Sequence, residues 1–181
     1  MLSDLDYRAL QSDRVTILVG STEESFRVPG GLLIHYSPSF RKMCQSSFKE
    51  SLTKVIKLPE VEIPTFKNFL IWLHAFQPSI QIESFQDVVD LAIFAEMYLV
   101  YHLRNQTSDA LRAALSNGKW SPTPEEVSTV YLHVPFGCIL RKLCSFGFAN
   151  ASPDRWTGVT TRQYPDTSVW RSVFENSADF G

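Results

Sequence analysis

The sequence predicts an α+β fold, in which a small β-sheet is covered by a cluster of α-helices. Two short apolar runs, residues 15–19 (VTILV) and 25–28 (SFRV), flank a Gly-Ser-Thr turn and are expected to form a hairpin. A third alternating run, residues 54–58 (KVIKL), stops at a proline and is expected to be another strand. From residue 64 to residue 148 the apolar positions recur at helical spacing instead.

Two short helices are expected between the second and third strands. Residues 32–36 form an apolar helical turn. Ser37 is expected to cap the helix that follows, because a serine before a proline is typical of a helix start. Phe40, Met43 and Cys44 fall on one face of that helix and are expected to be buried.

A series of longer helices is expected after the third strand. The first begins at Pro64 and the second after Ser84, with Leu99 as the last residue of its apolar face. Another helix contains Leu103, Thr107, Ala110, Leu111 and Ala114, and Asn117-Gly118 is expected to end it. Thr123-Pro-Glu-Glu126 has the pattern of a capping box and predicts a further helix start. Residues 136–148 are interpreted as one more helix.

The chain is expected to divide into four segments. Residues 1–12 are a polar leader, residues 13–116 the main domain, and residues 117–148 a C-terminal helical pair. Residues 149–181 are rich in Ser, Thr, Asp and Pro and are interpreted as a loosely ordered tail with a short helix near its end.

Composition argues against nucleic-acid binding and membrane insertion. The formal net charge is −2, which gives no broad attraction to nucleic acid or to an anionic membrane. No run of about 18 apolar residues is present. The three cysteines have irregular spacing, which is not typical of a disulfide framework and suits a reducing compartment. With no signal-peptide pattern at the start, we expect a cytoplasmic or nuclear location.

The sequence does not show the common patterns of catalytic sites. Glycine-rich phosphate-binding motifs, the GxSxG nucleophile motif and the HExxH zinc motif are missing. The histidines at positions 35, 74, 102 and 133 are widely spaced and lie in or beside apolar stretches, where packing is a more common role than catalysis. We therefore predict that the chain is not an enzyme and that it binds neither a cofactor nor a metal.

Five segments in the correct order resemble the BTB/POZ domain. They are residues 13–20 (DRVTILVG), residues 25–41 with their hairpin strand and Leu-Leu-Ile-His-Tyr-Ser-Pro-Ser-Phe-Arg stretch, residues 48–60 (FKESLTKVIKLPE), residues 66–76, and residues 89–103 with DLAIFAEMYLVYHL. The resemblance covers residues 13–116. Residues 124–148 resemble the helical pair that follows this domain in uncharacterised BTB proteins of filamentous fungi.

The resemblance implies a protein-interaction adaptor. In this family, an apolar residue followed by any residue and a glutamate contacts the cullin scaffold of ubiquitin ligases, and Phe48-Lys49-Glu50 matches that pattern. An aromatic anchor with a carboxylate at its rim suits such a contact. The alternative is that Phe48 packs on its own domain while Glu50 is solvated. The first hypothesis is therefore a substrate adaptor for a cullin-based ubiquitin ligase.

The second hypothesis is a homodimerisation or scaffold module without a ubiquitin-ligase role. In the family, self-association uses the first two helices, so Leu33, Tyr36 and Phe40 are the candidate dimer contacts. Core packing is the alternative for at least one of these three residues. Sequence alone does not show whether they form a contiguous exposed patch.

Overall fold

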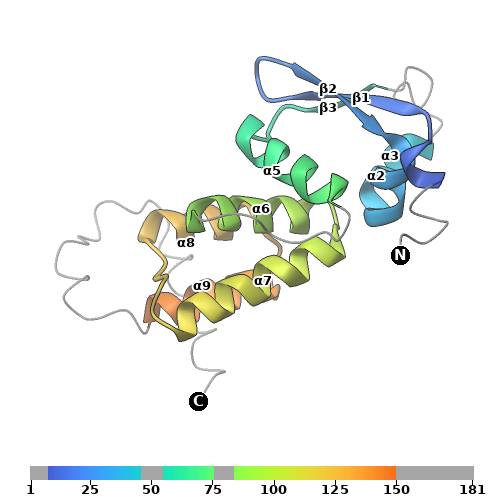
Figure 1. The fold of residues 1–181 in the computed structure, drawn as a ribbon. Helices are drawn as coiled ribbons and strands as arrows, with labels where there is room; N and C mark the ends of the chain where they lie inside the picture. Colours follow the sequence, from blue (N-terminus) through green and yellow to red (C-terminus); the bar gives the residue numbers. More distant parts are fainter. Residues whose placement is uncertain (1–7, 46–54, 76–83, 150–181) are drawn as a thin grey trace. The chain divides into compact units, whose positions relative to one another are not determined.

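The computed structural model describes residues 8–45, 55–75 and 84–149. The chain forms two compact units, residues 1–106 and 107–181. The elements in chain order are β1 (Arg14–Val19), β2 (Glu24–Pro29), α2 (Gly30–Tyr36), α3 (Pro38–Gln45), β3 (Val55–Leu58), α5 (Ile63–His74), α6 (Phe85–Met97), α7 (Tyr101–Ser116), α8 (Pro124–His133) and α9 (Ile139–Ala149) (Figure 1). A small sheet with several helices confirms the predicted α+β fold class.

The sheet has three strands in the order β2-β1-β3. β1 pairs antiparallel with β2, with Ile17 opposite Phe26, as the hairpin pattern predicted. β1 also pairs parallel with β3, with Ile17 opposite Ile56. Parallel neighbours need a long crossover, and the chain segment that contains α2 and α3 provides it. Because side chains alternate along a strand, Val15, Ile17 and Val19 all point to one buried face.

The helices α2, α3 and α5 lie on one side of the sheet (Figure 1). Ser37 separates α2 from α3 and caps α3 as predicted, because its Oγ accepts a hydrogen bond of 3.0 Å from the backbone N–H of Phe40. α5 has a proline in its first turn, and Ser84 caps α6 by accepting a 3.4 Å hydrogen bond from the N–H of Asp87. These helix starts were all predicted.

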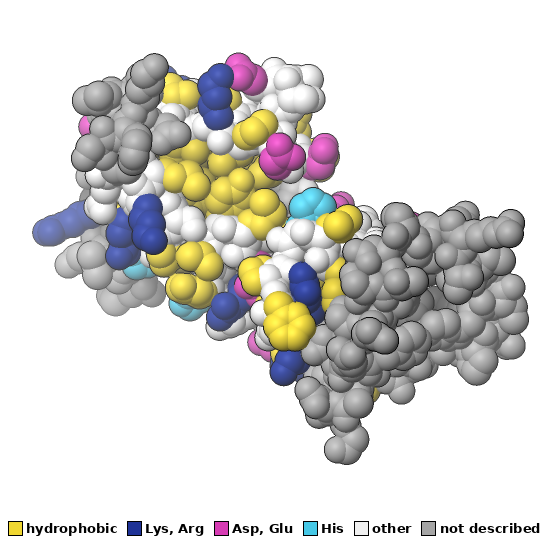
Figure 2. Space-filling model, turned by 180° about the vertical axis from the view of Figure 1, so that it is seen from behind, with side chains coloured by type: hydrophobic (Ala, Val, Ile, Leu, Met, Phe, Trp, Pro, Cys, Tyr) yellow, Lys and Arg dark blue, Asp and Glu magenta, His cyan; other side chains and the backbone are white. Residues whose placement is uncertain are grey.

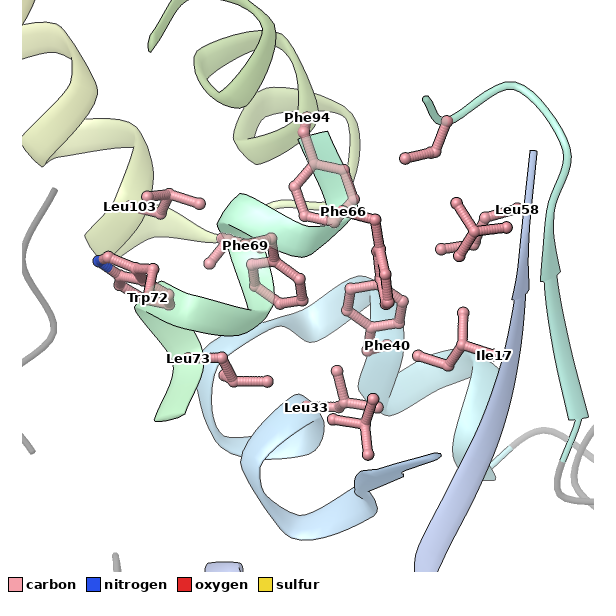
Figure 3. Packing of buried hydrophobic residues seen from close by; sticks show 14 of the residues in the cluster. Ile17, Leu33, Phe40, Leu58, Phe66, Phe69, Trp72, Leu73, Phe94 and Leu103 are labelled. Atoms are coloured by element: carbon pink, nitrogen blue, oxygen red, sulfur yellow. The ribbon is translucent and has the colours of Figure 1, made fainter. Parts of the chain in front are cut away.

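Aromatic rings fill the core of the first unit (Figure 3). Phe40 from α3, Phe69 from α5 and Phe94 from α6 meet there, with ring centroids 6.1 Å apart between Phe40 and Phe69 and 4.7 Å apart between Phe69 and Phe94. Trp72 is also buried, and its Nε1 donates a 2.9 Å hydrogen bond to Oε1 of Gln106. Full burial of one such ring stabilises the fold by about 1.5–3 kcal/mol, so this cluster holds α3, α5 and α6 together.

Residues 8–12, which were predicted to belong to a polar leader, pack against α2. The Oγ of Ser12 accepts a hydrogen bond from the N–H of Gly31 and donates one to the carbonyl of Ala9, each 2.7 Å long. A Cβ atom on Gly31 would lie 2.8 Å from the backbone of Ala9. Glycine at position 31 therefore permits the close approach of these two backbones.

The second unit contains the predicted capping box at the start of α8. The Oγ1 of Thr123 accepts a 3.2 Å hydrogen bond from the N–H of Glu126, and Oε2 of Glu126 accepts a 2.7 Å hydrogen bond from the N–H of Thr123. The predicted apolar face of α8 is buried and consists of Val127, Val130 and Tyr131, with Val134 just beyond the helix.

One helix boundary in the second unit was predicted wrongly. Residues 136–138 were expected to be helical, but α9 begins at Ile139. Gly137 has a left-handed backbone (φ 81°), and the side chain of Phe136 is mostly exposed. A glycine with positive φ cannot continue a right-handed helix, so residues 136–138 form a turn between α8 and α9.

Candidate protein-interaction surface

Exposed apolar side chains gather at the turn between α6 and α7 in the first unit. Met97, Leu99 and Tyr101 lie close together in the chain, and they are 38%, 36% and 44% exposed. Single exposed apolar residues are ordinary on a protein surface, whereas several at one place are typical of an interface. Figure 2 shows hydrophobic side chains gathered on one face of the unit that contains the sheet. The α6–α7 turn is therefore the candidate interaction surface.

Leu99 was predicted on the buried face of α6, and this prediction was wrong. α6 ends at Met97, and Leu99 has a left-handed backbone with φ 54°. The N–H of Val100 donates to the carbonyl of Ala95 (2.8 Å), and the N–H of Leu99 donates to the carbonyl of Glu96 (3.3 Å). This is a Schellman motif with leucine at the position that glycine usually occupies. The left-handed conformation costs a leucine about 1–2 kcal/mol and directs its side chain to the surface.

Tyr98 connects the α6–α7 turn to α3. Its ring stacks on that of Phe40 at 5.2 Å, with only 10° between the ring planes. Its carbonyl accepts a 2.5 Å hydrogen bond from Oγ of Ser37, the residue that also caps α3. The start of α3 and the α6–α7 turn are therefore held together by a partly buried contact, and residues 46–54 follow α3 in the chain.

Charged groups surround this turn. Burial and then the nearby Glu60 carboxylate raise the pKa of the Tyr98 hydroxyl above its usual range. Burial also raises the pKa of Glu96, which the neighbouring Arg104 lowers in part. The guanidinium of Arg104 lies 4.9 Å from the ring centroid of Tyr101 and 4.0 Å from a carboxylate oxygen of Glu96. Arg104 therefore links the buried carboxylate of α6 to the exposed ring of α7.

The predicted cullin contacts Phe48 and Glu50 lie outside the described residues. α3 ends at Gln45, three positions before Phe48. The assignment of Phe48 and Glu50 to a partner contact therefore stays a prediction. Met43 and Cys44 at the end of α3 are half-buried and pack against the core, as expected for their helix face.

The predicted dimer contacts have different environments. Leu33 and Phe40 have no exposed surface, because both lie in the core of the first unit. The core-packing alternative therefore applies to these two residues in the described structure. Tyr36 is half-buried and meets the rings of His35 and Trp72 edge-on, at 4.7 and 5.2 Å. Of the three, Tyr36 alone offers side-chain surface to a second chain, and its role there stays a prediction.

The histidines and cysteines do not come together as a reactive site. His35, His74, His102 and His133 are exposed, although all four have local contacts. The Nδ1 atoms of His74 and His133 lie 2.9 Å from the carbonyls of Leu70 and Thr129, and the rings of His35 and His102 meet that of Tyr36 edge-on. Burial raises the pKa values of the Cys44 and Cys144 thiols, which makes both poor nucleophiles. Among the described residues, no group of three or more His, Cys, Asp or Glu side chains is arranged to hold a metal ion.

Sequence reasoning missed Met97, Leu99 and Tyr101 as surface residues. The only available signal was that the apolar run continues past the end of the α6 pattern. A glycine or asparagine would have indicated the left-handed turn, but leucine is a helix former and predicts that the helix goes on.

No helix in the described parts of the chain combines the length and the apolar character that crossing a membrane requires.

A family model for the BTB/POZ domain matches residues 8–115 of this chain. The chain belongs to the BTB/POZ family. The BTB/POZ domain is a protein-interaction module that also mediates self-association, so this chain carries a protein-interaction domain. The matched residues include the candidate surface at the α6–α7 turn.

Proteins similar to this BTB/POZ chain include a plant relative and a solved human domain. The BTB/POZ domain-containing protein At4g08455 of Arabidopsis thaliana is 26% identical over 121 residues, which cover 63% of this chain and 49% of the relative. The alignment thus spans about half the length of that relative. The solved structure of the BTB domain of human gigaxonin is 18% identical, covers 60% of this chain and 94% of its own, and superposes with a TM-score of 0.43.

Proposed function

We propose that this BTB/POZ chain is a substrate adaptor that binds the N-terminal domain of a cullin in a ubiquitin ligase. The exposed apolar turn between α6 and α7 carries the proposal, because Tyr98 attaches it to the helix that precedes Phe48-Lys49-Glu50. Phe48 would supply the aromatic anchor and Glu50 the carboxylate at its rim. Met97, Leu99 and Tyr101 would add apolar contact area.

The substrate of such an adaptor would be bound elsewhere, or by a further partner. Residues 124–148 resemble the helical pair that extends a cullin contact, and α8 and α9 occupy this range. We also propose that the protein is cytoplasmic or nuclear and that it is related to the BTB proteins of filamentous fungi. Both proposals rest on the sequence.

Binding of a purified cullin N-terminal domain to the full chain tests this proposal. We expect a complex by isothermal titration calorimetry, and we expect the double variant Phe48→Ala with Glu50→Ala to weaken it at least about 30-fold, since truncating a central aromatic anchor commonly costs about 2 kcal/mol or more. Ile71→Ala is the control, because Ile71 is an exposed apolar residue on α5. A stable dimer that ignores cullin would contradict the proposal.

The second candidate function is self-association without a cullin. The half-exposed ring of Tyr36, with His35 and His102 edge-on to it, favours this function, since aromatic side chains are enriched at the centres of protein interfaces. Light scattering of the full chain and of Tyr36→Ala tests it. A dimer that Tyr36→Ala converts to a monomer supports self-association through α2, and a monomeric wild-type chain contradicts it.

A further inference from the structure

The three-stranded sheet has an open face, on the side opposite to α2, α3 and α5 (Figure 1). Side chains alternate along a strand, so the residues of β1 that lie between its buried positions point to this face. Residues that pair directly across neighbouring strands point to the same side of a sheet, and the register therefore adds residues of β2 and β3. The open face consists of Arg14, Thr16 and Leu18 on β1, Ser25 and Arg27 on β2, and Val55 and Lys57 on β3.

The centre of the open face is apolar. Leu18 on the central strand and Val55 on β3 are both half-buried. Neither of them belongs to the core cluster of the described residues or to the partly buried side chains that pack against it. Thr16, which pairs with Val55, is half-buried as well. The open face therefore offers a small apolar surface that the core of the first unit does not use.

Three exposed cationic side chains surround this apolar centre. Arg27 and Lys57 lie on the two outer strands, and Arg14 lies at the start of the central strand. Nη1 of Arg14 donates a 3.2 Å hydrogen bond to the backbone carbonyl of Arg27, so the Arg14 guanidinium lies beside β2. Lys57 forms an ion pair with Glu23 at 2.6 Å. Arg14 and Arg27 form no ion pair with any residue that the structure describes, so their charges are available to a partner.

We propose that the open face binds an acidic segment of a partner protein, in which carboxylates flank an apolar residue. The apolar side chain would lie over Leu18 and Val55, and the carboxylates would pair with Arg14 and Arg27. Guanidinium groups form paired hydrogen bonds with carboxylates, and such charge-assisted bonds are stronger than neutral ones. This face gives the chain a second binding surface, which is independent of the proposed cullin contact.

The chemistry of the open face favours an acidic peptide over a nucleic acid. The face carries no aromatic side chain for a base to stack on, and stacking is a main source of affinity for single strands. Only Arg14 and Arg27 are uncompensated, whereas nucleic-acid binding commonly uses many phosphate contacts. The net charge of the whole chain is −2, so the positive charge of this face is a local feature.

A fluorescein-labelled acidic peptide tests the inference on the full chain. The probe carries one leucine between two pairs of aspartates, and the control peptide has asparagines in place of the aspartates. We expect fluorescence anisotropy to show saturable binding of the probe that weakens as salt increases, because exposed charges are screened. We expect the control peptide to bind at least about tenfold more weakly. A dissociation constant for the probe above about 1 mM would overturn the inference.

Matched variants test whether the open face is the binding surface. Arg14→Gln with Arg27→Gln removes both uncompensated charges, and we expect it to weaken probe binding at least about tenfold. Lys42→Gln with Lys119→Gln is the control, because both lysines are exposed, neither belongs to the open face, and the net charge changes equally. We expect this control to change the affinity less than about twofold. Equal losses in the two double variants would contradict the inference, since they would indicate attraction by net charge alone.

Folding and selectivity are checked in the same experiment. Melting temperatures show whether each variant is folded, and Arg27→Gln alone leaves the hydrogen bond from Arg14 to the backbone in place. We expect this single variant to weaken probe binding about threefold, and no change in affinity would again contradict the inference. Complete displacement of the probe by single-stranded DNA of equal charge, at equal concentration, would overturn the assignment to an acidic peptide. None of these outcomes depends on whether the chain binds a cullin.

Discussion

At the scale of single residues, the α6–α7 turn explains why a residue that fits the apolar pattern of a helix lies on the surface. Leu99 continues the apolar periodicity of α6 but lies outside that helix with φ 54°. Val100, the next residue, is fully buried, and the left-handed backbone of Leu99 separates it from α6. The Schellman hydrogen bonds then satisfy the free carbonyls at the end of α6.

The variant Leu99→Asn tests whether Leu99 contributes to binding, with only a small effect on the stability of the fold. Leu99→Asn relieves the left-handed strain, because asparagine tolerates this conformation, and it loses only a partly exposed side chain. We expect the free energy of unfolding to change by less than about 1 kcal/mol, and the affinity for the cullin domain to fall several-fold. Urea denaturation and calorimetric titration measure the two quantities. Unchanged affinity would exclude Leu99 from the interface.

At the scale of elements, helix starts were the most predictable features of this chain. Ser37, Ser84 and Thr123 were all expected at helix starts, and each one caps its helix in the structure. Capping depends on residues within one turn of each other, so the local sequence is sufficient to predict it. The parallel pairing of β1 with β3 was not predicted, because it joins strands that are far apart in the chain, with β2, α2 and α3 between them.

The capping box of α8 makes a quantitative prediction. Thr123→Ala removes the hydrogen bond that the N–H of Glu126 donates to Oγ1 of Thr123, and we expect a loss of about 1 kcal/mol in the free energy of unfolding. Thr129→Ala in the same helix is the matched control, since Thr129 Oγ1 only donates to the exposed carbonyl of Glu125 (2.9 Å). Chemical denaturation compares both with the wild type. Equal losses would show that the cap contributes no special stability.

At the scale of the whole molecule, the pH dependence of stability should report the buried carboxyl of Glu96. Its pKa is raised in the folded chain above the ordinary value of 4.5, so the folded state holds this proton more tightly than the unfolded state. The stability contributed by the protonated form is therefore present below pH 4.5 and is lost as the pH rises through the folded pKa.

Glu96→Gln removes this titration. We expect the variant to be more stable than the wild type at pH 7, and the difference to shrink towards pH 4, where the wild-type carboxyl is protonated. Loss of the 4.0 Å contact with Arg104 should offset part of the gain. Melting temperatures measured between pH 4 and pH 8 check this expectation. A variant that is less stable than the wild type at pH 7 would show that the contact between Glu96 and Arg104 stabilises the fold by more than burial of the Glu96 carboxylate destabilises it.

The sequence by itself determined the α+β class, the hairpin, the helix starts and the family of this chain. These features depend on the alternation of apolar residues and on hydrogen bonds within a few positions, which the order of residues encodes directly. Tertiary structure decided that Leu33 and Phe40 are buried while Leu99 and Tyr101 are exposed. Burial depends on which distant elements cover a side chain, and the ring contacts of Phe40 on α3 with α5 and α6 show this directly.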